Sequence, residues 1–91
     1  MKQHHFDLSV TVDERTGEIL SVYFEIRKGR SAETREYCDG AAFADYDRSG
    51  NLLGIEMLAP CKLRVLNRIE GAEPQVRKFL KGAVPRAMVT A

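Results

Sequence analysis

The segment DYDRSGNLLGIE, residues 45–56, carries oxygen-bearing side chains at the spacing of a calcium-binding loop. Such a loop has Asp at its first position, Asp or Asn at its third, Gly at its sixth and Glu at its twelfth, because these groups surround one hard cation at a sharp turn. Those positions, together with a fifth-position hydroxyl, are filled by Asp45, Asp47, Gly50, Glu56 and Ser49. Calcium binding is therefore one interpretation of this segment.

The flanking residues favour a β-hairpin turn instead. A calcium loop of this type lies between two helices. Here the preceding REYCDGAAFA contains the turn-forming pair Asp39-Gly40, and Pro60 follows Glu56 closely enough to break a helix. We expect a polar turn ending in Gly50, and no metal site.

A second segment resembles the first but lacks its ligands. When Gly17 is aligned with Gly50, VDERTGEILSV at residues 12–22 matches DYDRSGNLLGI at residues 45–55. In this copy the first, third and twelfth loop positions hold Val12, Glu14 and Tyr23, in place of Asp, Asp or Asn, and Glu. The repeat predicts two β-hairpins, each with a glycine at positive φ.

Other residues capable of chemistry do not form a recognisable site. Cys38 and Cys61 have neither the spacing of a CxxC pair nor that of a small disulfide scaffold, so we expect reduced thiols rather than a disulfide or metal ligands. His4 and His5 lie at the terminus without a third ligand nearby. No phosphate-binding glycine loop or nucleophile elbow occurs. We expect no catalytic residues, no cofactor and no enzyme activity.

Length and composition indicate one ordinary globular domain of 91 residues, with 44% hydrophobic and 30% charged residues. No apolar run approaches the length of about 20 residues that crosses a bilayer. The start, MKQHHFDLSV, lacks a secretory core, which predicts a cytoplasmic location and no membrane partner.

Charge is distributed unevenly along the chain. Residues 1–60 hold seven Lys/Arg against eleven Asp/Glu, a balance of −4, and residues 61–91 hold seven against two, a balance of +5. The basic segment either packs on its own acidic sheet or meets nucleic acid or an acidic partner. We favour packing, because apolar residues separate the basic ones.

Alternating apolar residues predict antiparallel strands that share one buried face. That face is expected to carry Leu20, Val22, Phe24, Ile26, Leu53, Ile55 and Met57, joined by Val10, Val12, Ala41 and Phe43. A further strand is expected at Glu33–Cys38, before the Asp39-Gly40 turn.

The C-terminal third is predicted to cover this face. A helix should start at Glu73-Pro74 and end near Gly82 and Pro85, with an apolar stripe of Val76, Phe79, Leu80 and Ala83. Residues 61–70 fit either a short helix, which we favour, or a strand. We expect an α+β domain: an antiparallel β-meander of four to five strands over residues 5–60, covered by a helical segment over residues 61–91. Phe24, Phe43, Ile55 and Phe79 should be buried together.

The run AETREYCDGAAFADYDRSGNLLGIEML resembles the small bacterial family called domain of unknown function 2283. The matching positions are Thr34, Glu36, Asp39, Gly40, Asp45, Tyr46, Asp47, Gly50, Gly54, Ile55, Glu56 and Leu58. The resemblance covers residues 10–60 and implies a short protein, in some members similar to the antitoxin partners of small toxins. It implies no catalytic positions.

Two individual residues carry structural expectations. Gly54 in the middle of a strand indicates a bulge or the close approach of another chain. Glu56 is expected on the solvent face of the sheet rather than paired with Arg35.

These observations predict a non-catalytic protein-interaction module. The partner is expected to be a second copy, giving a homodimer, or another small protein. The surface should include the edge Phe6–Val12 and the uncovered side chains of Ile19 and Tyr23. The alternative is nucleic-acid binding through a basic set, namely Lys62, Arg64, Arg68, Arg77, Lys78 and Lys81.

Overall fold

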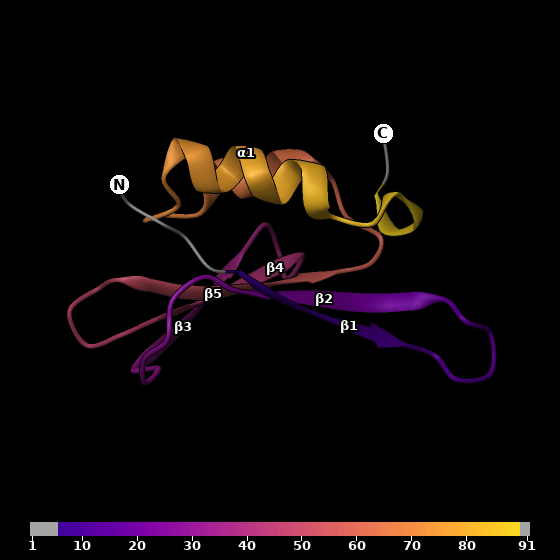
Figure 1. Cartoon of the computed structure of the whole chain (residues 1–91), viewed down its shortest axis with the longest axis horizontal. Coiled ribbons are helices and arrows are strands. Elements are labelled where there is room, and N and C mark those ends of the chain that lie inside the picture. The colour runs from indigo at the N-terminus through magenta and orange to yellow at the C-terminus, as the bar shows by residue number, and fades with distance from the viewer. Residues whose placement is uncertain (1–5, 90–91) are drawn as a thin grey trace.

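The computed structural model describes residues 6–89 and contains a five-stranded antiparallel sheet with a helical layer on one face (Figure 1). The strands are β1 (Asp7–Val12), β2 (Ile19–Glu25), β3 (Glu33–Tyr37), β4 (Ala42–Tyr46) and β5 (Leu52–Leu58). The helical layer consists of the 3₁₀-helix η1 (Leu63–Arg68), the α-helix α1 (Pro74–Ala83) and the 3₁₀-helix η2 (Arg86–Met88). The expected α+β class, with a sheet covered on one face, is confirmed.

The strand order is β1-β2-β5-β4-β3. Strands β3, β4 and β5 form a meander, and the β1–β2 hairpin joins it through antiparallel pairing of β2 with β5. The last strand along the chain is therefore the central strand of the sheet. The two edges are β1 and β3, far apart in space and different in sequence.

The two predicted hairpins are present, and their glycines explain why. Gly17 lies between β1 and β2 with φ of 77°, and Gly50 lies between β4 and β5 with φ of 87°. Left-handed backbone of this kind carries little penalty for glycine and a larger one for other residues. The Asp39-Gly40 turn between β3 and β4 also has positive φ at both residues.

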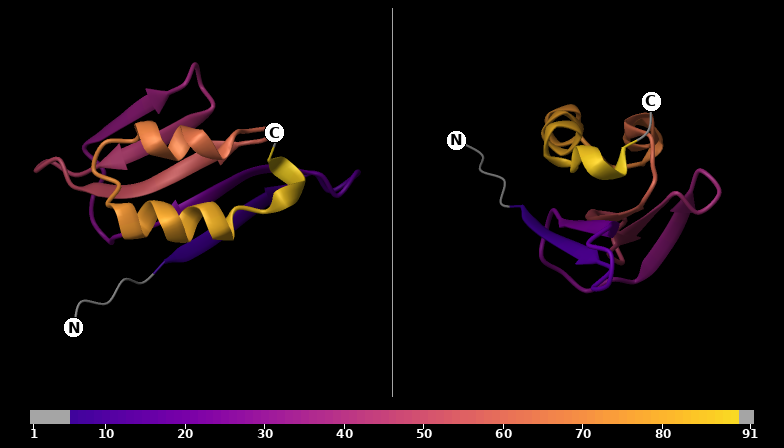
Figure 2. Two further views of the ribbon diagram at one scale, coloured as in Figure 1. Left: turned by 90° about the horizontal axis from the view of Figure 1, so that it is seen from above. Right: turned by 90° about the vertical axis from the view of Figure 1, so that its right-hand side faces the viewer.

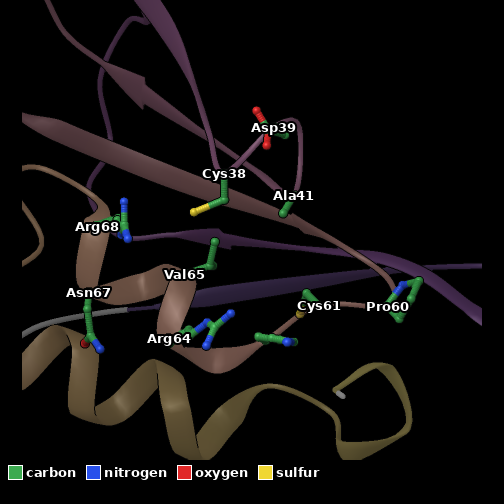
Figure 3. Close-up of a pocket in the computed structure, with 10 residues that line it drawn as sticks. Cys38, Asp39, Ala41, Pro60, Cys61, Arg64, Val65, Asn67 and Arg68 are labelled. Atoms are coloured by element: carbon green, nitrogen blue, oxygen red, sulfur yellow. The ribbon is translucent and has the colours of Figure 1, made fainter. Parts of the chain in front are cut away.

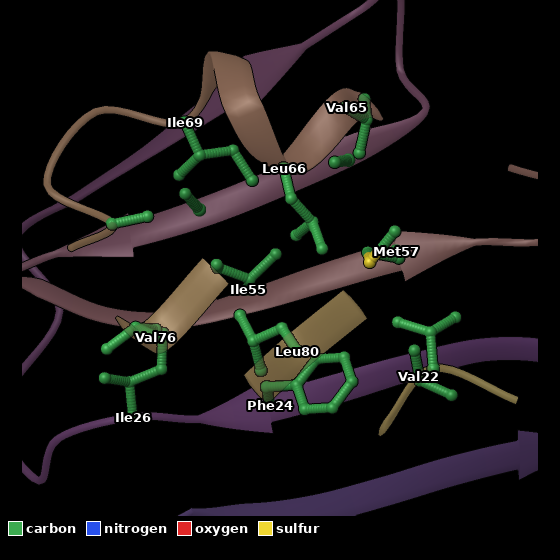
Figure 4. Packing of buried hydrophobic residues seen from close by; sticks show 14 of the residues in the cluster. Val22, Phe24, Ile26, Ile55, Met57, Val65, Leu66, Ile69, Val76 and Leu80 are labelled. Carbon is green, nitrogen blue, oxygen red and sulfur yellow. The ribbon is translucent and has the colours of Figure 1, made fainter. Parts of the chain in front are cut away.

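The core lies between the covered face of the sheet and the helical layer (Figure 4). Val22, Phe24, Ile55 and Met57 supply the centre of the sheet side and are fully buried. The helical layer contributes chiefly Val65, Leu66, Ile69, Val76, Leu80, Val84 and Met88. Seen from above, α1 runs over the β1–β2 side of the sheet and η1 over the β4–β5 side (Figure 2).

The prediction that Phe43 belongs to this core is wrong. Phe43 is opposite Glu56 on the other face of the sheet, while Ala42 and Ala44 point into the core. Successive strand residues alternate between faces, so burying these two alanines turns Phe43 outward. The alanines are small, and they belong to the same buried cluster as larger helical-layer side chains such as Leu66.

Two bulges overturn the expected orientation of two leucines. Leu53 has no partner on β4, because the register shifts there by one residue. Leu52 therefore joins the core, and Leu53 is buried outside the core, beside the backbone of Gly29. Leu20 likewise has no partner on β1, and its side chain is 46% exposed. The extra residue of a bulge exchanges the faces to which the following side chains point. A prediction that assumes strict alternation along the strand therefore assigns these side chains to the wrong face.

Helix α1 begins at Pro74 as expected, but Phe79 does not belong to its buried face. Val76 and Leu80 are buried, whereas Phe79 is 48% exposed. The helical period places Val76 and Leu80 on one line and Phe79 at its flank. Gly82 lies inside the helix, and the helix ends where the Val84 N–H bonds the Leu80 carbonyl.

Residues 61–70 contain a short helix and no strand. Leu63–Arg68 is a 3₁₀-helix, which agrees with the favoured interpretation, and Cys61 just before it forms an isolated bridge with Val89. Within residues 6–89, no helix combines the length and the apolar character needed to span a bilayer.

Candidate interaction surface

The calcium-like segment forms the β4–β5 hairpin, as predicted. The Asp47 carboxylate accepts hydrogen bonds from the backbone N–H groups of Ser49 and Asn51 at 2.9 and 2.8 Å, and from the Asn51 side chain at 3.0 Å. The Asn51 and Ser49 donors hold the pKa of Asp47 below its usual value. This carboxylate therefore closes the turn.

The first acidic residue of the segment, Asp45, is also engaged by protein groups. The hydroxyls of Tyr23 and Thr34 donate to its two oxygens at 2.9 and 2.6 Å. Burial, followed by the hydrogen bond to Asp45, raises the pKa of Tyr23 to about 12. In the part of the chain that the structure describes, no group of three or more His, Cys, Asp or Glu side chains could hold a metal ion. The predicted absence of a metal site stays a prediction.

Gly54 explains how Tyr23 reaches across β5. A Cβ at Gly54 would collide with the Tyr23 hydroxyl and would lie 2.9 Å from the Phe24 carbonyl oxygen. The strand bulge at Leu53 is next to it. Of the two expected causes of a mid-strand glycine, the bulge is present, and the close approach is made by the chain's own Tyr23 rather than by another chain.

Glu56 lies on the face of the sheet that the helical layer leaves uncovered, as predicted. Its cross-strand neighbours are Tyr23 and Phe43. Arg35 belongs to the other face, where it contacts Glu33 and Glu70 at 2.7 and 2.8 Å. Its guanidinium also lies 4.4 Å from the centre of the Tyr46 ring.

A cavity of about 760 Å³ separates η1 from the β3–β4 turn (Figure 3). Its lining consists of Cys38, Asp39, Ala41, Pro60, Cys61, Lys62, Arg64, Val65, Asn67 and Arg68. Cys38 is exposed, whereas Cys61 is buried and burial raises its pKa. His4 and His5 lie outside the described residues.

Acidic residues gather on the uncovered face, and the C-terminal basic residues lie on the opposite side of the sheet. The uncovered face carries Glu25, Glu36, Asp45 and Glu56 by their register in the sheet. Seven of the 14 Lys/Arg residues belong to residues 61–89, which form the helical layer and cover the sheet through the apolar core. Among residues 6–89 the ion pairs are Lys28–Glu25, Arg35–Glu33 and Arg35–Glu70, so no basic residue of the helical layer neutralises a sheet acid.

The most unusual surface is the edge strand β1. All six of its residues are exposed. Leu8 and Val10 are opposite Phe24 and Val22, so they continue the covered face beyond its helical cover. Leu8, Val10 and Val12 are 46%, 43% and 44% exposed. We call the strand and this apolar row the β1 edge.

The other edge, β3, has a different character. Its sequence is ETREY, and three of its five residues are charged. Charged side chains on an edge strand discourage pairing with another chain. On β1, the only charged residue is Asp7 at its start. The β1 edge is therefore the one open to pairing.

Phe79 extends the β1 edge into the helical layer. Its ring stacks on that of Phe6, just before β1, with centroids 4.6 Å apart and an angle of 13° between the planes. The sequence identified Phe6–Val12 as an edge but not Phe79, whose helical spacing assigned it to the core. Ile19 and Tyr23 were also expected at the interface. Tyr23 lies on the uncovered face, but Ile19 packs against the core.

Comparison with known proteins gives no match among family models, curated proteins or solved structures.

Proposed function

We propose that this chain is a non-catalytic protein-interaction module that binds its partner along the β1 edge. The observation that carries the proposal is an edge strand whose six residues are all exposed and include a row of half-exposed apolar ones. An edge strand offers unpaired backbone N–H and C=O groups, and adding a strand from another chain satisfies them. The apolar row would supply affinity beyond the backbone bonds.

The arrangement of the reactive side chains supports a non-catalytic role. Asp45 and Asp47 both accept hydrogen bonds that shape the sheet and a turn. Arg35 contacts two carboxylates and one aromatic ring. The contacts of these groups are made within the sheet, its turns and the adjoining helical layer. Membership of the family named above, a bacterial origin, a cytoplasmic location and an antitoxin-like role are parts of the same proposal and rest on the sequence.

The test is co-purification from the native cell with the parent chain and with Val10→Lys. Val10 is exposed, so the substitution should leave the fold intact while placing a charge in the apolar row. The matched control is Glu36→Lys, on the charged β3 edge. The proposal expects the partner to be lost with Val10→Lys and kept with Glu36→Lys. Retention of the same partner by both variants would contradict it.

A second candidate function is nucleic-acid binding by the basic helical layer. The observation that favours it is the gathering of Lys62, Arg64 and Arg68 around the cavity beside η1. Neutralising phosphates with such residues makes affinity fall steeply with salt. Retention on RNA or DNA, with a salt slope reduced in Arg64→Ala plus Arg68→Ala, would support this function. Equal retention of parent and variant would exclude this surface.

A further inference from the structure

We infer that the partner of the β1 edge is a second copy of this chain, paired β1 to β1 about a two-fold axis at Ser9. This inference rests on the proposed function, because it names the partner of the same edge. It commits to a homodimer in which the two sheets join into one, with both helical layers on the same side.

Backbone geometry limits where the two-fold axis can lie. Directly opposite residues of antiparallel strands point to the same face of a sheet. Each copy's Leu8 and Val10 face the helical layer, and Ser9 faces the other way. Even-numbered residues must therefore oppose even-numbered ones. Pairing of even with even residues requires that the two-fold axis pass through a residue and not between two residues. The two residues nearest the middle of β1 are Ser9 and Val10, so these are the two registers to compare.

Charge decides between these two registers. An axis at Val10 would bring Asp7 next to the partner's Asp13, the first residue after β1, at both ends of the paired strands. Like charges directly opposite each other destabilise a sheet. An axis at Ser9 places Asp7 opposite the partner's Thr11 instead. The Ser9 register is therefore favoured.

The Ser9 register also places the apolar residues of one copy opposite apolar residues of the other. It places Leu8 opposite the partner's Val10, and Phe6 opposite the partner's Val12. The Phe6 ring is the one that stacks on Phe79. The partner's Val12 would thus be added beside this aromatic pair. Moving the axis to Leu8 would leave Val12 without a partner from β1.

The charged β3 edge explains why assembly would stop at two copies. A two-fold pairing of β1 uses the apolar edge of both chains. The free edges of the joined sheet are then the two β3 strands, each with Glu33, Arg35 and Glu36. Such edges resist further strand addition.

Cysteine cross-linking tests the register directly. In a Cys38→Ser background, which removes the exposed native thiol, Ser9→Cys and Val10→Cys are oxidised separately. In the Ser9 register, the two introduced thiols of Ser9→Cys are directly opposite. Opposed Cα atoms in antiparallel strands lie about 4.5–5.5 Å apart, which is within disulfide reach. Ser9→Cys should form covalent dimer severalfold faster than Val10→Cys. Faster linking by Val10→Cys would overturn the axis at Ser9.

Sedimentation measures the association of the parent chain and of two lysine variants. Its outcomes distinguish a failure of this inference from a failure of the proposed function. Val10→Lys should weaken the dimer by about tenfold or more, because it sets a charge among apolar neighbours. Thr11→Lys should keep or tighten it, because the new charge would face the partner's Asp7. A parent that stays monomeric would overturn the second copy as partner and leave the β1 edge to another protein. A dimer that both variants leave unchanged would overturn the β1 edge itself.

Discussion

At the scale of single residues, the uncovered face depends on the missing side chain of Gly54. An added methyl group would displace the Tyr23 hydroxyl from Asp45 and crowd the Phe24 carbonyl. We expect Gly54→Ala to lower the free energy of unfolding by about 1–3 kcal/mol, as overpacking usually does. Urea unfolding measures this change.

Gly82→Ala is the matched control. Gly82 lies in α1, and a methyl group added there would meet no atom within 4 Å. Alanine is favoured over glycine inside a helix, so the free energy of unfolding should rise by about 0.5–1 kcal/mol. If Gly54→Ala also raised it, the close approach of Tyr23 would not be a constraint.

The Tyr23 hydroxyl also predicts a dependence on pH. Burial and Asp45 raise its pKa to about 12 in the folded chain, above the value near 10 expected when unfolded. Because the folded state holds this proton more tightly, its contribution is complete below pH about 10 and is lost as pH rises to about 12. Unfolding followed at several pH values should show stability falling across this window, less steeply for Tyr23→Phe. An identical slope for parent and variant would refute the assignment.

At the scale of elements, α1 offers two adjacent residues with opposite expected behaviour. Leu80 is fully buried, and its truncation to Ala should cost about 2–5 kcal/mol. Phe79 is half-exposed and stacked on Phe6, so Phe79→Ala should cost only about 1 kcal/mol. Urea unfolding in the Val10→Lys background keeps self-association out of the comparison. Equal losses would mean that Phe79 is buried after all.

The β4–β5 hairpin gives a prediction about metal. Its first two acidic residues already accept hydrogen bonds from Tyr23, Thr34, Ser49 and Asn51. We expect calorimetric titration with calcium to give no saturable heat in the micromolar range. A tight one-site isotherm that disappears in Glu56→Gln would show that the segment is a calcium loop.

The elements were predictable from sequence because their signals are local. Gly17 and Gly50 located the hairpins, and Pro74 located the start of α1. Orientation within the elements was less predictable, because it depends on contacts between distant residues. The bulge at Leu53 and the choice of face for Phe43 follow from pairing between strands, which a single strand's pattern does not reveal.

The candidate surface was predictable only in part, for the same reason. The apolar alternation of Leu8, Val10 and Val12 and the scarcity of charge identify an edge in the sequence. That β1 extends past its helical cover depends on how far α1 reaches across the sheet (Figure 2). Phe79 joins this surface only through its stacking on Phe6.

At the scale of the whole molecule, the two edges of the sheet have unequal roles. The strand order leaves β1 and β3 at opposite sides, one apolar and one charged. A small domain gains proportionately more than a large one from burying such surface against a copy of itself. We therefore expect one closed interface, formed by β1.

The most direct test of this claim is sedimentation equilibrium of the parent chain at micromolar concentration. We expect a mass about twice the 10.2 kDa of one chain, returning toward 10.2 kDa in Val10→Lys. A parent mass of 10.2 kDa at every concentration would contradict the dimer and the role of the β1 edge in forming it.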